Sequence, residues 1–186
     1  MAYSVCVFCG ARGGNDVVFA DIADAFGREL GERGMSLVYG GGNIGLMGRL
    51  ADAVLDCDGT VVGVIPEFLS DREVLHTGIS ECIRVDDLFD RKAVMIEKSD
   101  AFVALPGGIG TYDEIIEVIA WRQLKQLRQP IGLLNANGFF EPFLALLAHT
   151  VECGFLREDE ISHIHVETNA MALIDALQSD ASDSTL

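Results

Sequence analysis

Residues 101–114 read AFVALPGGIGTYDE, and this stretch gives the clearest indication of the fold class. Residues 101–105 are an uncharged apolar run, which is typical of a buried strand. Three closely spaced glycines follow, and the pattern of apolar residues then predicts a helix over residues 111–127. A buried strand that turns through glycines into a helix is the repeating unit of a parallel sheet covered by helices.

The same alternation runs along the whole chain. Strands are predicted at 4–9, 36–39, 60–65, 81–85, 101–105, 131–134 and 163–166, and helices at 16–33, 43–56, 86–98, 111–127, 141–153 and 169–177. Residues 66–80 are expected to be irregular, and Asn43 is the expected N-cap of the second helix. The prediction is an α/β fold: one Rossmann-like, doubly wound domain over residues 1–178, with a mostly parallel sheet and helices on both faces. Residues 179–186 are small and polar and are expected to form a flexible tail.

The charge of the chain excludes several partners. Its 186 residues include 29 Asp and Glu against 13 Lys and Arg, which gives a formal charge of −16. Nucleic acids and anionic membranes repel such a protein, so neither is expected as a partner. No apolar run reaches the roughly 18 residues of a membrane span. A small phosphorylated ligand is not excluded, because it responds to local donors rather than to net charge.

The cysteines and the first residues indicate the compartment. Five cysteines form an odd and scattered set, so a disulfide framework is not expected. The chain enters an apolar strand almost at once, without the pattern of a signal peptide. Both features favour a cytoplasmic protein.

Two short motifs suggest redox or metal chemistry but have simpler interpretations. Cys6 and Cys9 have the spacing of a redox motif, yet they fall within a predicted strand, on opposite faces, which favours burial. His163 and His165 lie two residues apart with no acidic or cysteine partner at a ligand spacing. No metal is therefore expected.

Three glycine clusters follow three of the predicted strands, at residues 10–14, 40–45 and 107–110. The carboxyl ends of parallel strands lie at one edge of the sheet, where open α/β folds bind their ligands. Each cluster taken alone is compatible with a simple tight turn. Three clusters at one edge predict a binding site there.

The third cluster predicts a phosphate cradle. Gly107, Gly108 and Gly110 allow backbone N–H groups to approach an anion closely, together with the N–H of Ile109. The helix that follows adds unpaired donors and the positive end of its dipole, and Thr111 adds a hydroxyl. The P-loop pattern with its lysine is absent, so hydrolysis of nucleoside triphosphates is not expected.

The second cluster allows two interpretations. Gly40, Gly42 and Gly45 fit the dinucleotide pattern GxGxxG, with Glu67 after the next strand, which is the arrangement of an NAD site. However, this cluster follows the second strand rather than the first. The alternative is that Gly41 and Gly42 lie near the phosphate and add N–H donors.

These motifs together resemble the Lonely Guy (LOG) family of Rossmann-like proteins. The family pattern PGGxGTxxE is matched in full by residues 106–114, and an Arg-Lys pair before it is matched by Arg91 and Lys92. Supporting matches lie at 7–10, 40–48, 61–66 and 131–135, so the resemblance covers roughly residues 4–155.

The resemblance implies a nucleoside 5′-monophosphate phosphoribohydrolase. Such an enzyme cuts the N-glycosidic bond of a cytokinin ribotide or of AMP and releases the free base and ribose 5-phosphate. It implies a homodimer whose interface includes the helices around residues 91–121, and no cofactor. Lys92 and Met95 are expected near the substrate. From the residues alone, Met95 and Trp121 are candidates to border the base, although a core position is the better interpretation of large apolar residues on helices. Arg12 is a candidate for the phosphate, with a solvated position as an equal alternative.

The resemblance also selects Arg91 and Glu114 as the catalytic pair. Glu114 lies one helical turn beyond Thr111 and can face the ribose, activate water and stabilise a cationic sugar. From the residues alone, Glu114 is better explained as an acidic residue that favours the start of a helix. Arg91 is likewise better explained, without the resemblance, as a solvated partner of Asp87 or Asp90.

Departures from the family pattern concern the base rather than this pair. Phe89 and Asp90 stand where the family usually has His-Glu, and Ala11 stands where a serine is common. The alternative function is that of a carrier of the molybdenum cofactor, since such carriers resemble this family in fold and in the glycine-rich loop, without hydrolysis.

Overall fold

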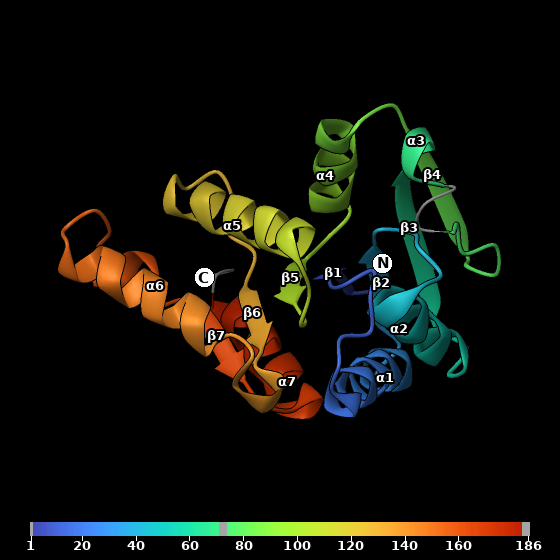
Figure 1. The fold of residues 1–186 in the computed structure, drawn as a ribbon, viewed down its shortest axis with the longest axis horizontal. Helices are drawn as coiled ribbons and strands as arrows, with labels where there is room; N and C mark the ends of the chain where they lie inside the picture. Colours follow the sequence, from blue (N-terminus) through green and yellow to red (C-terminus); the bar gives the residue numbers. More distant parts are fainter. Residues whose placement is uncertain (1, 71–73, 184–186) are drawn as a thin grey trace.

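The computed structural model describes residues 2–70 and 74–183 and contains one sheet of seven strands. The strand order is β4-β3-β2-β1-β5-β6-β7, and every neighbouring pair is parallel. The strands are β1 (Ser4–Phe8), β2 (Ser36–Tyr39), β3 (Thr60–Pro66), β4 (Glu81–Val85), β5 (Ala101–Ala104), β6 (Ile131–Leu134) and β7 (Ile164–Glu167) (Figure 1).

The strand order places a topological switch between β1 and β5. From β1 the chain moves outward through β2, β3 and β4, and it then returns to pair β5 with the other side of β1. The register aligns Val5 with Ala101 and Phe8 with Ala104, so the two strands end together. The loops after them diverge toward opposite faces, which leaves the crevice where such sheets bind ligands.

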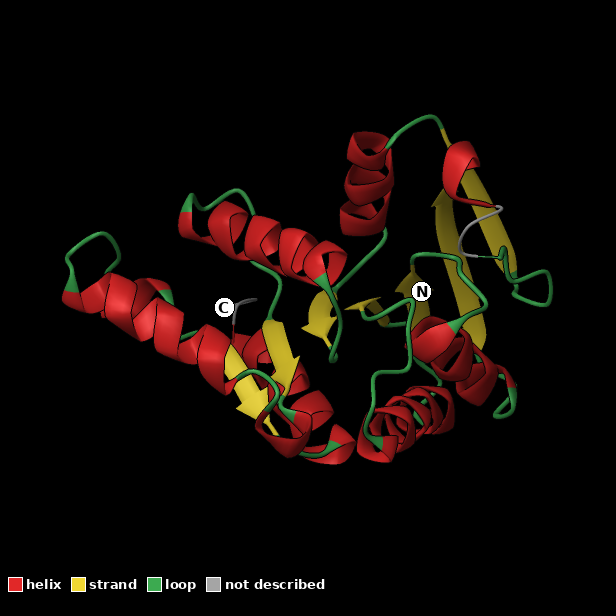
Figure 2. Cartoon of the chain, in the orientation of Figure 1, coloured by secondary structure: helices red, strands yellow, loops and turns green. Residues whose placement is uncertain are grey.

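Helices cover both faces of the sheet, as predicted (Figure 2). Residues of β1 alternate between two apolar cores, with Val5 and Val7 in one and Cys6 and Phe8 in the other. The first core is closed by α1 (Val17–Glu32), α2 (Gly45–Leu55) and α7 (Ala170–Asp183), and the second by α4 (Leu88–Glu97), α5 (Ile109–Gln123) and α6 (Glu141–Glu152). The predicted doubly wound α/β fold is confirmed.

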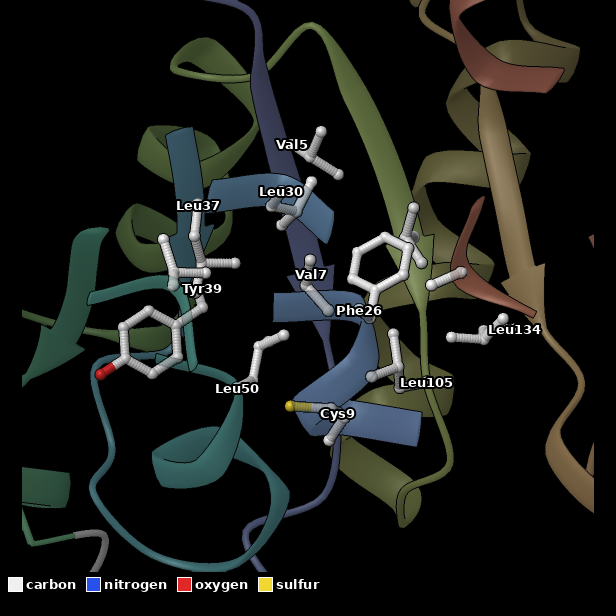
Figure 3. Close-up of a cluster of buried hydrophobic side chains, with 14 of the residues drawn as sticks. Val5, Val7, Cys9, Phe26, Leu30, Leu37, Tyr39, Leu50, Leu105 and Leu134 are labelled. Carbon is white, nitrogen blue, oxygen red and sulfur yellow. The ribbon is translucent and has the colours of Figure 1, made fainter. Parts of the chain in front are cut away.

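The first core fixes α1 and α2 against the strands that carry two of the glycine clusters. Phe26, Leu30 and Leu50 are fully buried over the sheet beside Val7 (Figure 3). Burial of each such side chain stabilises the fold by about 1.5–3 kcal/mol. The two helices approach so closely that a Cβ on Gly27 would lie 2.6 Å from the carbonyl oxygen of Leu50.

Two local predictions were wrong in the region after the second strand. α2 begins at Gly45 with Ile44 as its N-cap residue, whereas Asn43 donates its backbone N–H to the carbonyl of Val74, 2.8 Å away. Residues 66–80 are not irregular throughout, because β3 includes Pro66 and a one-turn helix, α3 (Glu67–Ser70), follows. The first difference reflects a contact between the second glycine loop and the segment after α3, whereas Pro66 extends β3 by pairing with Val85 of β4.

The end of the chain is more ordered than predicted. α7 extends to Asp183, past Leu177 where the predicted helix stops. Asp180 explains the extension, because its carboxylate lies 3.2 Å from Nη2 of Arg122 and 3.1 Å from Nε2 of His165. Residues 184–186 of the predicted tail lie outside the described residues. Two 3-10 helices, η1 (Ala136–Gly138) and η2 (Glu158–Glu160), occupy connections that the sequence left unassigned.

Candidate active site

A cavity of about 510 Å³ opens at the carboxyl ends of β1 and β5, in the crevice between their loops. All three glycine clusters contribute to it, as predicted for this edge of the sheet. The lining consists of residues 7–14, Phe19, Gly40, Leu46, Met47, Arg91, residues 106–111, Glu114 and Phe139.

The loop after β5 has the features of an anion site. Pro106 anchors it, since its carbonyl accepts the N–H of Gly10 at 3.1 Å from the neighbouring loop. Gly108 is the N-cap residue of α5 and offers no side-chain cap, so the first N–H groups of the helix keep their hydrogen-bonding capacity for a ligand. Thr111 is 4% exposed and lines the cavity with its first helical turn. The positive end of the helix dipole adds to the attraction of an anion.

The glycines of this loop are of two kinds. A Cβ on Gly107 would lie 2.0 Å from Oγ1 of Thr111, so the protein's own packing requires that glycine. A Cβ on Gly108 or Gly110 would meet no atom within 4 Å, and neither residue has a positive φ. Neither the backbone conformation nor the packing therefore explains these two glycines, whereas close approach of a ligand to the backbone does.

Arg91 is held against the second glycine loop. Its side chain is only 6% exposed, and its Nη2 donates to the carbonyl oxygen of Gly40 at 3.2 Å. A Cβ on Gly40 would lie 1.9 Å from that nitrogen, so only glycine leaves room for the guanidinium. Asp87 caps α4 instead, accepting the N–H groups of Phe89 and Asp90. The interpretation of Arg91 as a solvated surface residue is therefore wrong.

Glu114 lines the same cavity, one turn of α5 beyond Thr111. Its electrostatic relation to Arg91 is visible in the buried thiol of Cys6 in β1. Burial raises the pKa of Cys6 well above its usual value; Glu114 raises that pKa further, while Arg91 lowers it. The two predicted catalytic residues thus act with opposite charges on the same thiol, that of Cys6.

Four predicted substrate residues do not line the cavity. Met95 is 1% exposed and belongs to the core on the α5 side of the sheet. Lys92 points to α5, where its Nζ lies 2.6 Å from Glu117 and 3.2 Å from Asp113. Gly41 and Gly42 contact other parts of the protein: a Cβ on Gly41 would lie 3.2 Å from Ile65, and Gly42 forms a bridge with Leu75. Met95 is buried because it lies on the apolar face of α4. Arg91 and Lys92 are successive residues of the helix, so their side chains point in different directions.

The second glycine loop packs on protein rather than on a ligand. Gly41 has a φ of +79°, Gly42 forms an isolated bridge with Leu75, and Gly45 has a φ of +62°. A Cβ on Gly45 would lie 2.4 Å from the backbone of Ala11. Two glycines of the dinucleotide pattern, Gly40 and Gly45, thus have structural causes, which weakens the sequence argument for an NAD site.

Two aromatic side chains of the cavity lining, Phe19 and Phe139, were not predicted from the sequence. Phe19 of α1 and Phe139 after η1 pack edge to face, with ring centroids 5.6 Å apart. No motif marks either residue, because long-range folding alone brings them together. Trp121 is outside the lining, whereas Arg12 contributes to it.

Metal and membrane features are lacking in the described part of the chain. Residues 2–70 and 74–183 contain no group of three or more His, Cys, Asp or Glu placed to hold a metal ion. No helix in these residues is long and apolar enough to cross a bilayer. The five cysteines are free, and Cys6 and Cys9 are buried on opposite faces, as the strand position predicted.

Solved structures share this architecture. The molybdenum cofactor carrier protein of Chlamydomonas reinhardtii superposes with a TM-score of 0.74 at 18% identity, covering 98% of this chain and 99% of that chain. The molybdenum cofactor binding protein of Rippkaea orientalis gives a TM-score of 0.69, also at 18% identity, with coverage of 96% and 97%. At this identity the likeness shows the fold alone.

Closer relatives are found by sequence. The probable cytokinin riboside 5′-monophosphate phosphoribohydrolase LOGL1 of Oryza sativa subsp. japonica is 48% identical over 155 residues, 83% of this chain and 70% of that protein. The cytokinin riboside 5′-monophosphate phosphoribohydrolase LOG5 of Arabidopsis thaliana is 43% identical over 175 residues, 94% of this chain and 76% of that protein.

A family model described as "Possible lysine decarboxylase" matches residues 47–177, which include Arg91, the loop after β5 and Glu114. The matched part exceeds half of the chain, and the relatives named phosphoribohydrolases cover most of it. On these grounds the chain belongs to this family, the Lonely Guy (LOG) family.

Proposed function

We propose that the protein hydrolyses the N-glycosidic bond of a purine nucleoside 5′-monophosphate, AMP or a cytokinin-type ribotide, to the free base and ribose 5-phosphate. One observation carries the proposal: Arg91, Glu114 and the open glycines Gly108 and Gly110 line a single cavity at the start of α5. Relatives named for this activity support the choice of substrate class.

The 5′-phosphate is bound by the loop after β5. The N–H groups at the start of α5 donate to its oxygens, and Thr111 supplies a hydroxyl donor. Gly108 and Gly110 let the phosphate approach the backbone without steric conflict. Arg12 of the first loop supplies a second positive charge to the same cavity. Binding therefore depends on local donors, although the whole chain is acidic.

Cleavage breaks the bond between ribose C1′ and the base nitrogen, and the base leaves with the electron pair. Positive charge develops on the sugar, as in glycoside hydrolysis, and the carboxylate of Glu114 stabilises it. A water molecule adds to C1′ and gives a proton to Glu114, while the leaving base takes up a proton. The products are ribose 5-phosphate and the neutral base.

Arg91 supplies positive charge and orientation. Its bond to Gly40 fixes one guanidinium nitrogen, and the fork as a whole lines the cavity. Arg91 thus supplies a fixed positive charge to the anionic nucleotide bound in the cavity that Glu114 also lines.

The experiment is an assay of the purified protein with AMP and an N6-modified AMP, with chromatographic detection of free base and ribose 5-phosphate. Glu114→Gln should lower kcat by a factor of about 100 to 10,000, because it removes the base and its charge. Asp113→Asn is the matched control, since Asp113 lies on the same helix and pairs with Lys92 outside the cavity.

Two results would overturn the proposal. One is the lack of base release from every nucleoside monophosphate tested, with a fluorescent pterin copurifying instead; this would favour the function of a cofactor carrier. The other is a Glu114→Gln variant that retains the activity of the wild type.

We propose further that the protein is a homodimer that contacts its partner through α4 and α5. These helices expose large apolar side chains, among them Phe89 at 78%, Ile109 at 84% and Ile116 at 48%. Such a concentration of exposed apolar area is typical of an interface. Light scattering coupled to size exclusion should give twice the chain mass, and Phe89→Glu should shift it toward the monomer.

The cytoplasm is the compartment that we propose for the enzyme. Its support is chemical: the exposed thiols of Cys82 and Cys153 remain free, which suits a reducing environment. Fractionation of cells with an antibody to the protein tests this assignment.

A further inference from the structure

A second cavity, of about 410 Å³, lies at the other end of α5, where the helix gives way to the loop before β6. Residues of that loop and of η2 line it. Four cationic residues line it: Arg122, Lys125, Arg128 and Arg157. None of them belongs to the active-site cavity at the start of the helix.

This concentration of positive charge is exceptional in the chain. Residues 118–140 contain three cationic residues and no Asp or Glu, in a protein whose net charge is −16. Two of the four cations that line the cavity have ion-pair partners. Arg122 pairs with Asp180, and Arg157 pairs with Asp159 and Glu160, which line the cavity as well. Lys125 and Arg128 form no ion pair within the part of the chain that the structure describes. The positive charges of these two residues at the cavity are therefore left without an ion-pair partner among the described residues.

Lys125 occupies a backbone position that favours glycine. Its φ is +59°, directly after Leu124, the C-cap residue of α5. Its N–H donates to the carbonyl of Arg122 at 2.9 Å, and that of Gln126 donates to Trp121 at 2.9 Å. These two bonds define a Schellman motif, whose left-handed residue is usually glycine. A lysine here places a flexible cation at the cavity against the local preference of the backbone, which points to a use of its charge.

Arg122 builds the scaffold of the cavity. Its Nη1 donates to the carbonyl oxygens of Arg128, at 3.2 Å, and of Gln129. The side chain thereby ties the loop that carries Lys125 and Arg128 to the end of α5. It also offsets the negative end of the helix dipole, which would otherwise oppose an anion.

His163 adds a polar group without a protein partner. Its Nε2 is buried and makes no hydrogen bond with any described residue. Burial lowers the pKa of His163, and the positive charge of Arg122 lowers it further, so the imidazole is neutral at pH 7. A buried ring nitrogen left unsatisfied beside a cationic cavity is a group that a ligand or its water can satisfy.

We propose that this cavity binds a small anion with two or more phosphate groups, held by Lys125 and Arg128 and seated on the loop that Arg122 fixes. A charge of at least two matches the two unpaired cations, and a small ligand matches the volume. This site is separate from the active site and does not depend on the proposed function. Inorganic pyrophosphate and ADP both carry two linked phosphate groups, and only ADP adds a nucleoside.

Calorimetric titration of the full chain with inorganic pyrophosphate tests the site. The double variant Lys125→Gly/Arg128→Ala should bind one pyrophosphate fewer per chain than the wild type, or bind it at least tenfold more weakly. Lys98→Ala is the control, because Lys98 is an exposed lysine at the C-cap of α4 that does not line this cavity and has only a 3.9 Å contact to Glu81. A titration with ADP then distinguishes the sources, since tighter binding of ADP assigns the site to a nucleotide.

A second measurement guards against a folding artefact. Lys125→Gly alone should raise the Tm by about 2–4 °C, because glycine relieves the left-handed backbone, while it weakens pyrophosphate binding. The proposal is overturned if the double variant binds pyrophosphate as the wild type does. It is also overturned if Lys98→Ala loses binding to the same extent, since the effect would then come from overall charge.

Discussion

The two glycine loops on either side of β1, residues 40–45 after β2 and 106–110 after β5, use the same residue for different purposes. In the first loop, packing and backbone conformation require the glycines. Gly40 leaves room for Arg91, and Gly45 combines a positive φ with close contact to the backbone of Ala11. In the second, Gly108 and Gly110 face open space. Gly108 and Gly110 therefore have neither a conformational nor a steric cause within the protein, which makes them the candidates for close approach of a ligand.

The largest expected effect comes from the loop after β2. Gly45→Ala should lower the free energy of unfolding by about 2–4 kcal/mol, because φ is +62° and the new Cβ would meet the backbone of Ala11 and Arg12 at 2.4 Å. Chemical denaturation followed by circular dichroism measures the change.

Gly34→Ala separates the two causes in that prediction. Gly34 has a similar φ of +65°, but a Cβ there would meet nothing within 4 Å, so its loss should be only about 1 kcal/mol. Equal losses in both variants would mean that packing of this loop on Ala11 has no energetic weight.

Gly40→Ala should displace the guanidinium of Arg91 from its contact with this loop. The Cβ would lie 1.9 Å from Nη2 of Arg91, and the guanidinium must move away. Because the displaced atoms end a flexible side chain, stability should change little, whereas kcat should fall by about 100-fold, as for a misplaced catalytic group. Steady-state assay with AMP, paired with a melting curve, tests both parts. An active Gly40→Ala variant would show that the position of Arg91 is not needed for the reaction.

The smallest expected effect belongs to the open loop. Gly110→Ala should raise the free energy of unfolding by about 0.5–1 kcal/mol, because Gly110 lies inside α5 with a helical backbone and free space around it. The same methyl group should raise the KM for AMP by about tenfold, because it stands where the phosphate approaches. A stabilised variant with unchanged KM would remove the distinction between the two loops.

Much of the fold follows from the sequence. Continuous apolar strands such as residues 101–105 and amphipathic helices determine the α/β class and the two covered faces, since their periodicity is local information. The glycine loop at residues 106–110 and the pair of Arg91 and Glu114 are also predicted from the sequence, the first from its glycines and the second from the family pattern, and the structure places them around one cavity.

Other features depended on contacts between distant residues. Met95 and Lys92 stand next to Arg91 along α4, yet one is in the core and the other pairs with α5. Which neighbour of a predicted site residue faces the cavity depends on the rotation of the helix over the sheet. The aromatic pair of Phe19 and Phe139 shows the same limit, because the two residues share no motif.

From its sequence alone, this acidic chain is predicted to have an anion site made of backbone donors, because a glycine-rich turn into a helix supplies such donors without lysine. The tertiary structure alone decided which glycines are open, since openness depends on atoms far along the chain, as Arg91 shows for Gly40. It also decided that Lys125 and Arg128 gather at the far end of α5 beside His163. Local pattern determines backbone chemistry, whereas long-range packing determines which groups share a cavity.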